Sequence, residues 1–167
     1  PGGFTEFVPL PFVHMEAPIY LQGCARLGPT FREAVLMHAV SRLVFHAHIP
    51  TIQASWVKLG PVGLQYSVGA CVNDVGGTLM NETITRSAGA NHGQEMPPET
   101  LESLICNAGR VPRQRTTLYG TPPEERRAAP IGPPALNPCV NTLARGDANN
   151  TNTKRNLLLS GLFSELP

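Results

Sequence analysis

The sequence predicts an α/β fold in which crossover helices join parallel strands, followed by a disordered tail. Residues 1–120 alternate strand-like and helix-like patterns in the order βαβαβααβ, which is typical of parallel sheets. Residues 121–167 carry 7 of the 17 prolines and one aromatic residue, Phe163. Such a composition buries too little apolar surface to offset the entropy of ordering. We therefore predict a folded region over 1–120 and a disordered tail over 121–167, in which 157–163 could form a short helix.

The first half of the folded region predicts two strands separated by a helix. Residues 6–13 form a short strand, and its two prolines place it at an edge. After a loop, Thr30 and Glu33 form a capping box that opens a helix ending near residue 47. A strand over 51–57 follows and is stopped by Gly60-Pro61. One face of the helix carries apolar residues at helical spacing, namely Leu36, Ala39, Val40, Leu43, Val44 and Ala47.

The second half adds two further strands and three helices. A brief helix over 62–69 leads into a strand over 71–75, and a helix over 81–88 follows. Pro97-Pro98 starts another helix, for which Gly109 is the C′ glycine. Residues 113–119 form the last predicted strand. Since a full (β/α) barrel takes about 250 residues, the sequence predicts either a small open sheet or the C-terminal piece of a larger barrel.

Composition and charge narrow the class of protein. The net charge is +1 with 15% charged residues, and no basic run is interleaved with aromatic residues, so we expect no nucleic-acid binding. No apolar run approaches 18 residues and no signal peptide is visible, so we expect no membrane span and an intracellular, most simply cytoplasmic, protein. The chain begins at Pro1 without an initiator Met, so we expect that residue 1 is not a natural start.

Metal binding is not predicted from the residues themselves. The four cysteines are far apart, without the spacing of a zinc knuckle, an iron–sulfur loop or a disulfide framework. His14 and Glu16 form a His-x-Glu pair of the kind seen in zinc deaminases. That motif also needs a Pro-Cys-x-x-Cys partner, which the sequence lacks.

The most informative stretch is 69–82. An apolar strand ends in Asn73-Asp74, turns on Gly76-Gly77 and leads into a predicted helix with an acidic first turn. Glycine allows positive φ and close approach of a ligand to the backbone, and a helix start aims free amides at whatever lies above the strand. This pattern predicts a pocket wall; a simple tight turn with a solvated Asp74 is the alternative.

Polar residues also follow the other predicted strands, so a shared site is expected where parallel strands end. Trp56 could offer a ring face, or it could be an ordinary core residue, and Lys58 could hold an anion. No catalytic residue can be assigned. The candidate binding residues are His14, Glu16, Ser55, Trp56, Lys58, Asn73, Asp74, Gly76, Gly77, Thr78, Asn81, Glu82 and Arg115.

Several motifs together resemble one family over about residues 3–120. One is Asn73-Asp74-Val75-Gly76-Gly77-Thr78, and others lie at 6–18, 53–61, 92–98 and 113–119. In this order they resemble the C-terminal end of the FO synthases, in their tyrosine-condensing half. The resemblance implies a radical S-adenosylmethionine (SAM) enzyme on an incomplete (β/α) barrel, with a 4Fe-4S cluster held by a Cys-x-x-x-Cys-x-x-Cys loop.

The resemblance also implies substrates and a missing partner. Such enzymes join a 4-hydroxybenzyl group from L-tyrosine to 5-amino-6-(D-ribitylamino)uracil. The cluster loop is absent from this sequence, so we expect the fragment to be inactive without the N-terminal barrel half. By analogy, Asn73, Asp74 and Glu82 would meet ribose or ribityl hydroxyls, Trp56 would stack on a ring, and Lys58 or Arg115 would meet a carboxylate.

Other functions remain open at this point. Related radical SAM enzymes of menaquinone (futalosine) biosynthesis share parts of the Pro-Leu-Pro-Phe and Asn-Asp-x-Gly-Gly-Thr stretches. A non-catalytic α/β module could bind a nucleotide-like ligand through Gly76-Gly77-Thr78 and need no cluster. A metal-dependent hydrolase is a distant third possibility.

Overall fold

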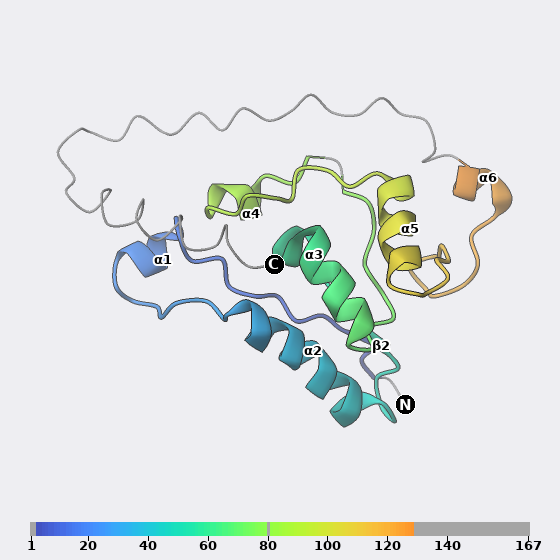
Figure 1. The fold of residues 1–167 in the computed structure, drawn as a ribbon, viewed down its shortest axis with the longest axis horizontal. Helices are drawn as coiled ribbons and strands as arrows, with labels where there is room; N and C mark the ends of the chain where they lie inside the picture. Colours follow the sequence, from blue (N-terminus) through green and yellow to red (C-terminus); the bar gives the residue numbers. More distant parts are fainter. Residues whose placement is uncertain (1–2, 80, 129–167) are drawn as a thin grey trace. The chain divides into compact units, whose positions relative to one another are not determined.

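A computed structural model describes residues 3–79 and 81–128 (Figure 1). Residues 129–167 of the tail predicted over 121–167, including the possible helix at 157–163, lie outside the described residues. Within the described part of the predicted tail, α6 (Glu124–Ala128) is helical. None of the helices in the described ranges is long and apolar enough to cross a membrane.

Parallel strands joined by helices are confirmed, but the strands are much shorter than predicted. β1 (Glu6–Phe7) pairs in parallel with β2 (Thr51–Ile52), with Glu6 opposite Thr51. A parallel bridge between Gln53 and Asp74 adds a third strand position beside β2. Pro9 and Pro11 lack the amide donors that would have continued β1. The predicted strand over 113–119 was wrong, since residues 111–115 have no regular structure and a turn follows.

The helices partly follow the predicted pattern. The capping box at Thr30 is confirmed and opens α2 (Phe31–Phe45). α5 (Pro98–Asn107) is followed by Gly109 in the left-handed region, as expected. α4 (Ile84–Ser87) is shorter than the helix predicted over 81–88, because Asn81 has a φ of +57° that an α-helix does not allow. The predicted loop over 14–29 contains α1 (Pro18–Leu21).

α3 (Trp56–Gly69) starts within the stretch that was predicted as a strand. Gly60 has a φ of +67° and breaks the helix, and Pro61 opens its second part. The positive φ favours glycine at position 60, and a Cβ there would make a tight contact of 3.1 Å with His92 Nδ1. Gly60-Pro61 therefore marks a helix kink and not the end of a strand.

The core lies between β2 and the helices. Ile52 and Ala54 are fully buried and pack in one cluster with Trp56 and Leu64 of α3 and with Leu101 of α5. Because side chains alternate along a strand, Thr51 and Gln53 point to the opposite face. This opposite face carries the polar groups described below.

α2 packs with an unexpected face. Its buried residues are Ala34, His38 and Ser41, whereas the predicted apolar stripe is largely exposed. The Nδ1 of His38 donates to the Ala34 carbonyl at 2.7 Å. His38 is fully buried, and burial lowers its pKa, which favours the neutral ring.

Candidate functional site

Three polar side chains form a row across the three strand positions. The Nε2 of Gln53 donates to Asp74 Oδ1 at 2.9 Å and to Glu6 Oε2 at 3.3 Å. Glu6 lies on β1, Gln53 follows β2, and Asp74 occupies the bridge. The short strands therefore bring two carboxylates to one amide, and Glu6 and Gln53 lie on the strand face opposite to Ile52.

Arg115 and Tyr119 reach this row from the segment that follows α5. The Nε of Arg115 donates to Asp74 Oδ2, and its Nη2 lies 3.6 Å from Glu6 Oε2. The guanidinium carbon lies 4.5 Å from the ring centroid of Tyr119, whose hydroxyl donates to Glu6 at 2.6 Å. The hydrogen bond to Asp74 raises the pKa of Arg115, and burial together with the bond to Glu6 raises the pKa of Tyr119.

The glycine turn is held from both sides. Asp74 Oδ1 accepts from the Gly76 amide at 2.9 Å, and Gly76 has a φ of +71°. The indole of Trp56 donates to the Gly77 carbonyl at 3.0 Å. Trp56 is 3% exposed, so it is a core residue that fixes the turn and presents no open ring face. No helix starts at the turn, and the Gly76 amide is already occupied.

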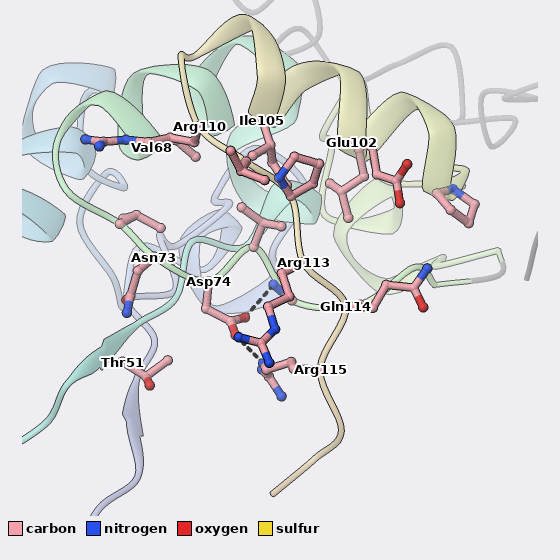
Figure 2. A pocket seen from close by; sticks show the side chains of 18 of the residues that line it. Thr51, Val68, Asn73, Asp74, Glu102, Ile105, Arg110, Arg113, Gln114 and Arg115 are labelled. Atoms are coloured by element: carbon pink, nitrogen blue, oxygen red, sulfur yellow. Dashed lines mark hydrogen bonds and ion pairs between the residues drawn. The ribbon is translucent and has the colours of Figure 1, made fainter. Parts of the chain in front are cut away.

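A cavity of about 660 Å³ lies beside the turn, within the size range of small-molecule sites. Figure 2 shows Asp74 and Arg115 joined at one side of it, with Glu102 and Ile105 of α5 across from them. Of the predicted binding residues, those that line the cavity are Asn73, Asp74, Gly76, Gly77, Thr78 and Arg115.

A second predicted group lies apart from the cavity. Ser55, Trp56 and Lys58 stand at the start of α3 and not at the end of a strand. Lys58 Nζ donates to the Thr85 hydroxyl at 2.9 Å, and Glu82 accepts from the Thr85 amide at 3.1 Å. The Lys58 bond joins α3 to α4, and the Glu82 bond lies within the segment that begins α4. Asn81 Oδ1 accepts from Arg86 at 3.0 Å in the same region.

His14 and Glu16 are also separate from the cavity lining. The His14 Nδ1 accepts from the Gly28 amide at 3.2 Å, and its ring packs edge-on against Tyr20 at 4.8 Å. The Glu16 amide donates to the Ala88 carbonyl at 2.9 Å, and the residue is exposed. His14 therefore stabilises the segment between β1 and α2 through its contacts with Gly28 and Tyr20.

Sequence reasoning missed Glu6, Gln53 and Tyr119. The signal was present for Glu6 and Gln53, because a charged or amide side chain inside a short apolar strand has to face away from the core. Tyr119 gave no such signal, since its position depends on how the segment after α5 returns to the sheet.

The described residues do not fit an iron–sulfur cluster. No group of three or more His, Cys, Asp or Glu side chains that could hold a metal ion occurs within 3–79 and 81–128. Cys24, Cys71 and Cys106 are free and exposed, and cluster binding needs several thiolates at one point. We therefore assign no cluster ligand to this part of the chain.

Parallel strands with crossover helices define an α/β protein, and its cavity lies beside polar groups at the strand positions. The family described as the CofH/MqnC C-terminal region matches residues 1–127. The chain belongs to this family.

Similar proteins carry related names. The chain is 52% identical over 128 residues to an FO synthase of Streptomyces coelicolor, covering 77% of this chain and 15% of that protein. It is 57% identical over 118 residues to a 5-amino-6-(D-ribitylamino)uracil–L-tyrosine 4-hydroxyphenyl transferase of Methanopyrus kandleri, covering 71% of this chain and 32% of that protein. The chain thus spans about a third or less of these relatives. No solved structure matches significantly.

Proposed function

We propose that this chain is the C-terminal part of a radical SAM transferase of deazaflavin biosynthesis. The parent enzyme would join the 4-hydroxybenzyl group of L-tyrosine to 5-amino-6-(D-ribitylamino)uracil. The observation that carries the proposal is the family match over residues 1–127, together with relatives named FO synthase and tyrosine 4-hydroxyphenyl transferase. The parallel strand order with crossovers α2 and α3 supports assignment to the last part of an incomplete (β/α) barrel.

Within the proposed substrate site, paired and unpaired groups take different roles. Asp74 already accepts hydrogen bonds from Gln53, Gly76 and Arg115, so we assign it to holding the wall in place. Thr78 and Glu102 line the cavity and form no hydrogen bond through their side chains within the described residues. They are free to meet the hydroxyl and N–H groups of a ribityl-substituted uracil.

A carboxylate would be met by a different arginine from the one that the sequence suggested. Arg115 is committed to Asp74 and Glu6. Arg113 lines the same cavity, and within the described residues its side chain donates one hydrogen bond, to the Thr121 hydroxyl at 2.7 Å. Because a guanidinium carries five N–H donors, Arg113 retains donors for the carboxylate of an amino acid such as tyrosine.

SAM and a 4Fe-4S cluster belong to the proposed parent enzyme. Since the described residues do not fit the cluster, its ligands are assigned to the part of the relatives that this chain does not span. The role proposed for this chain is to bind and orient the substrates.

A domain exchange tests the proposal. Residues 1–127 replace the matched region of the Methanopyrus kandleri transferase, and the chimera is purified anaerobically with its cluster reconstituted. We expect the condensation product of tyrosine and the aminouracil by mass spectrometry, with the unexchanged transferase as the control. A chimera that retains its cluster and cleaves SAM but makes no condensation product contradicts the proposed substrates. The menaquinone alternative and the non-catalytic binding module are not favoured by the names of the relatives.

A further inference from the structure

The outer surface of α2 carries a continuous apolar stripe. It consists of Leu36, Met37, Val40, Leu43 and Val44, which are between 47% and 78% exposed. We call these five residues the outer stripe. Between Ala34 and Phe45 the only charged side chain is that of Arg42. A helix that is apolar on most sides is normally buried in a larger protein, and large exposed apolar patches mark interaction surfaces.

The outer stripe is separate from the contacts that α2 already makes. Leu36, Val40 and Leu43 each lie two residues after a buried position, at about 200° around the helix. α3 covers a different flank, where the rings of Phe31 and Tyr66 meet edge-on at 5.5 Å. Met37 and Val44 each lie three residues after a buried position, whereas Phe31 lies three residues before one, so the stripe extends onto the flank of α2 opposite to α3. That flank needs a partner of its own.

β1 lacks a neighbour on the same side of the fold. Among the described residues it pairs with β2 and with no other strand, so its other edge carries unpaired backbone groups. α2 crosses from β1 to β2 (Figure 1). In a right-handed parallel array, a unit preceding β1 would place a strand beside β1 and a helix beside α2. One preceding β–α unit would thus cover both the free edge and the stripe.

We propose that the outer stripe is the docking surface for the helix of the β–α unit that precedes β1 in full-length family members. The inference rests on the barrel assignment in the proposed function. More than two thirds of the Methanopyrus kandleri transferase lies outside the match, since the matched region is 32% of that protein, so a unit of this kind has room. The occupant must be apolar on the side that faces α2, because the stripe offers no charge.

Photo-cross-linking in the full-length chimera identifies the occupant. Two chimeras carry residues 1–127 of this chain with Val40 replaced by p-benzoylphenylalanine. One is made in the Methanopyrus kandleri transferase and the other in the Streptomyces coelicolor FO synthase. We expect cross-links within one chain, mapped by mass spectrometry to the segment that precedes β1. Cross-links between two chains identify a second copy as the occupant and overturn the proposal. The absence of any cross-link also overturns the proposal. So does the result that the chimeras made from both relatives are insoluble.

A matched pair of substitutions checks that the stripe is responsible. Leu43→Glu lies in the stripe at 78% exposure, and Ile84→Glu lies on α4 at 77% exposure. We expect Leu43→Glu to abolish the cross-link at residue 40 and lower the melting temperature of the chimera, whereas Ile84→Glu leaves both unchanged. Equal effects of the two variants contradict the proposal. Product formation is measured in parallel, so an active chimera without the cross-link refutes only the docking, and a cross-linked inactive chimera refutes only the function.

Discussion

Asp74 and Arg115, 41 residues apart in the chain, join the third strand position to the segment that follows α5. The Asp74 side chain is 8% exposed and that of Arg115 is 30% exposed. This pair fixes one wall of the cavity, because Asp74 also holds the glycine turn and Arg115 also contacts Glu6 and Tyr119. The segment after α5 is therefore held by two carboxylates, of which Asp74 is the more deeply buried.

Replacing Arg115 by alanine tests the contribution of its pair with Asp74. We expect Arg115→Ala to lower the free energy of unfolding by about 1–3 kcal/mol, between the values for exposed and buried ion pairs, because it leaves a buried carboxylate without its cation. Urea denaturation measures the change. Arg113→Ala is the matched control, since the Arg113 side chain donates an exposed hydrogen bond to Thr121 and none to the buried carboxylate. Equal losses in the two variants would show that the Asp74–Arg115 pair contributes nothing specific.

The indole of Trp56 offers a second test of the wall. Trp56→Phe keeps an aromatic ring in the core but removes the hydrogen bond to the Gly77 carbonyl. We expect a loss of about 1–3 kcal/mol from the hydrogen bond and the smaller ring, with faster amide exchange in the 75–79 segment. Hydrogen-exchange mass spectrometry measures the second effect. If exchange rises equally across the whole chain, the indole does not hold the turn specifically.

The local elements were predictable where one short motif determines them. The capping box at Thr30 and the C′ glycine at 109 satisfy helix ends through neighbouring residues, so the sequence alone indicates them. The parallel strand order could also be predicted from the alternation of patterns. The lengths of the strands could not be predicted, because strand pairing depends on residues that are distant in the chain. β1 and β2 pair over only two residues each.

The candidate site was predictable at the glycine turn and less so elsewhere. Asn73, Asp74, Gly76, Gly77 and Thr78 do line a cavity, because one turn carries them together. Trp56 and Lys58 were expected at the end of a strand, but α3 begins at Trp56, so both residues belong to the helix layer. The contacts of Glu6 and Tyr119 depend on a chain return of 113 residues, which no local pattern encodes. The outer stripe of α2 shows the same limit, since periodicity finds an apolar face without revealing its partner.

Two adjacent glycines in the turn have different requirements. Gly76 has a φ of +71°, and a Cβ there would lie 3.4 Å from the Gln53 amide oxygen, whereas a Cβ at Gly77 meets nothing within 4 Å. We expect Gly76→Ala to cost about 1–2 kcal/mol, as left-handed backbone does for residues with a Cβ, and Gly77→Ala to be close to neutral. Thermal unfolding of both variants measures the difference. A Gly77→Ala loss as large as that of Gly76→Ala contradicts the assignment of strain to position 76.

His38 makes stability depend on pH. Burial lowers its pKa in the folded state below the ordinary value near 6.5, so the unfolded chain binds the proton more readily. The stabilising effect of the neutral ring is therefore fully present above about pH 6.5 and is lost as the pH falls below that value, at up to about 1.4 kcal/mol per pH unit for one proton.

His38→Asn removes the titrating ring while keeping a side-chain donor near the Ala34 carbonyl. We expect unfolding free energies measured from pH 7.5 to 5.5 to fall less steeply in His38→Asn than in the parent chain. Identical slopes for the parent and His38→Asn would show that the proton uptake on unfolding belongs to other groups.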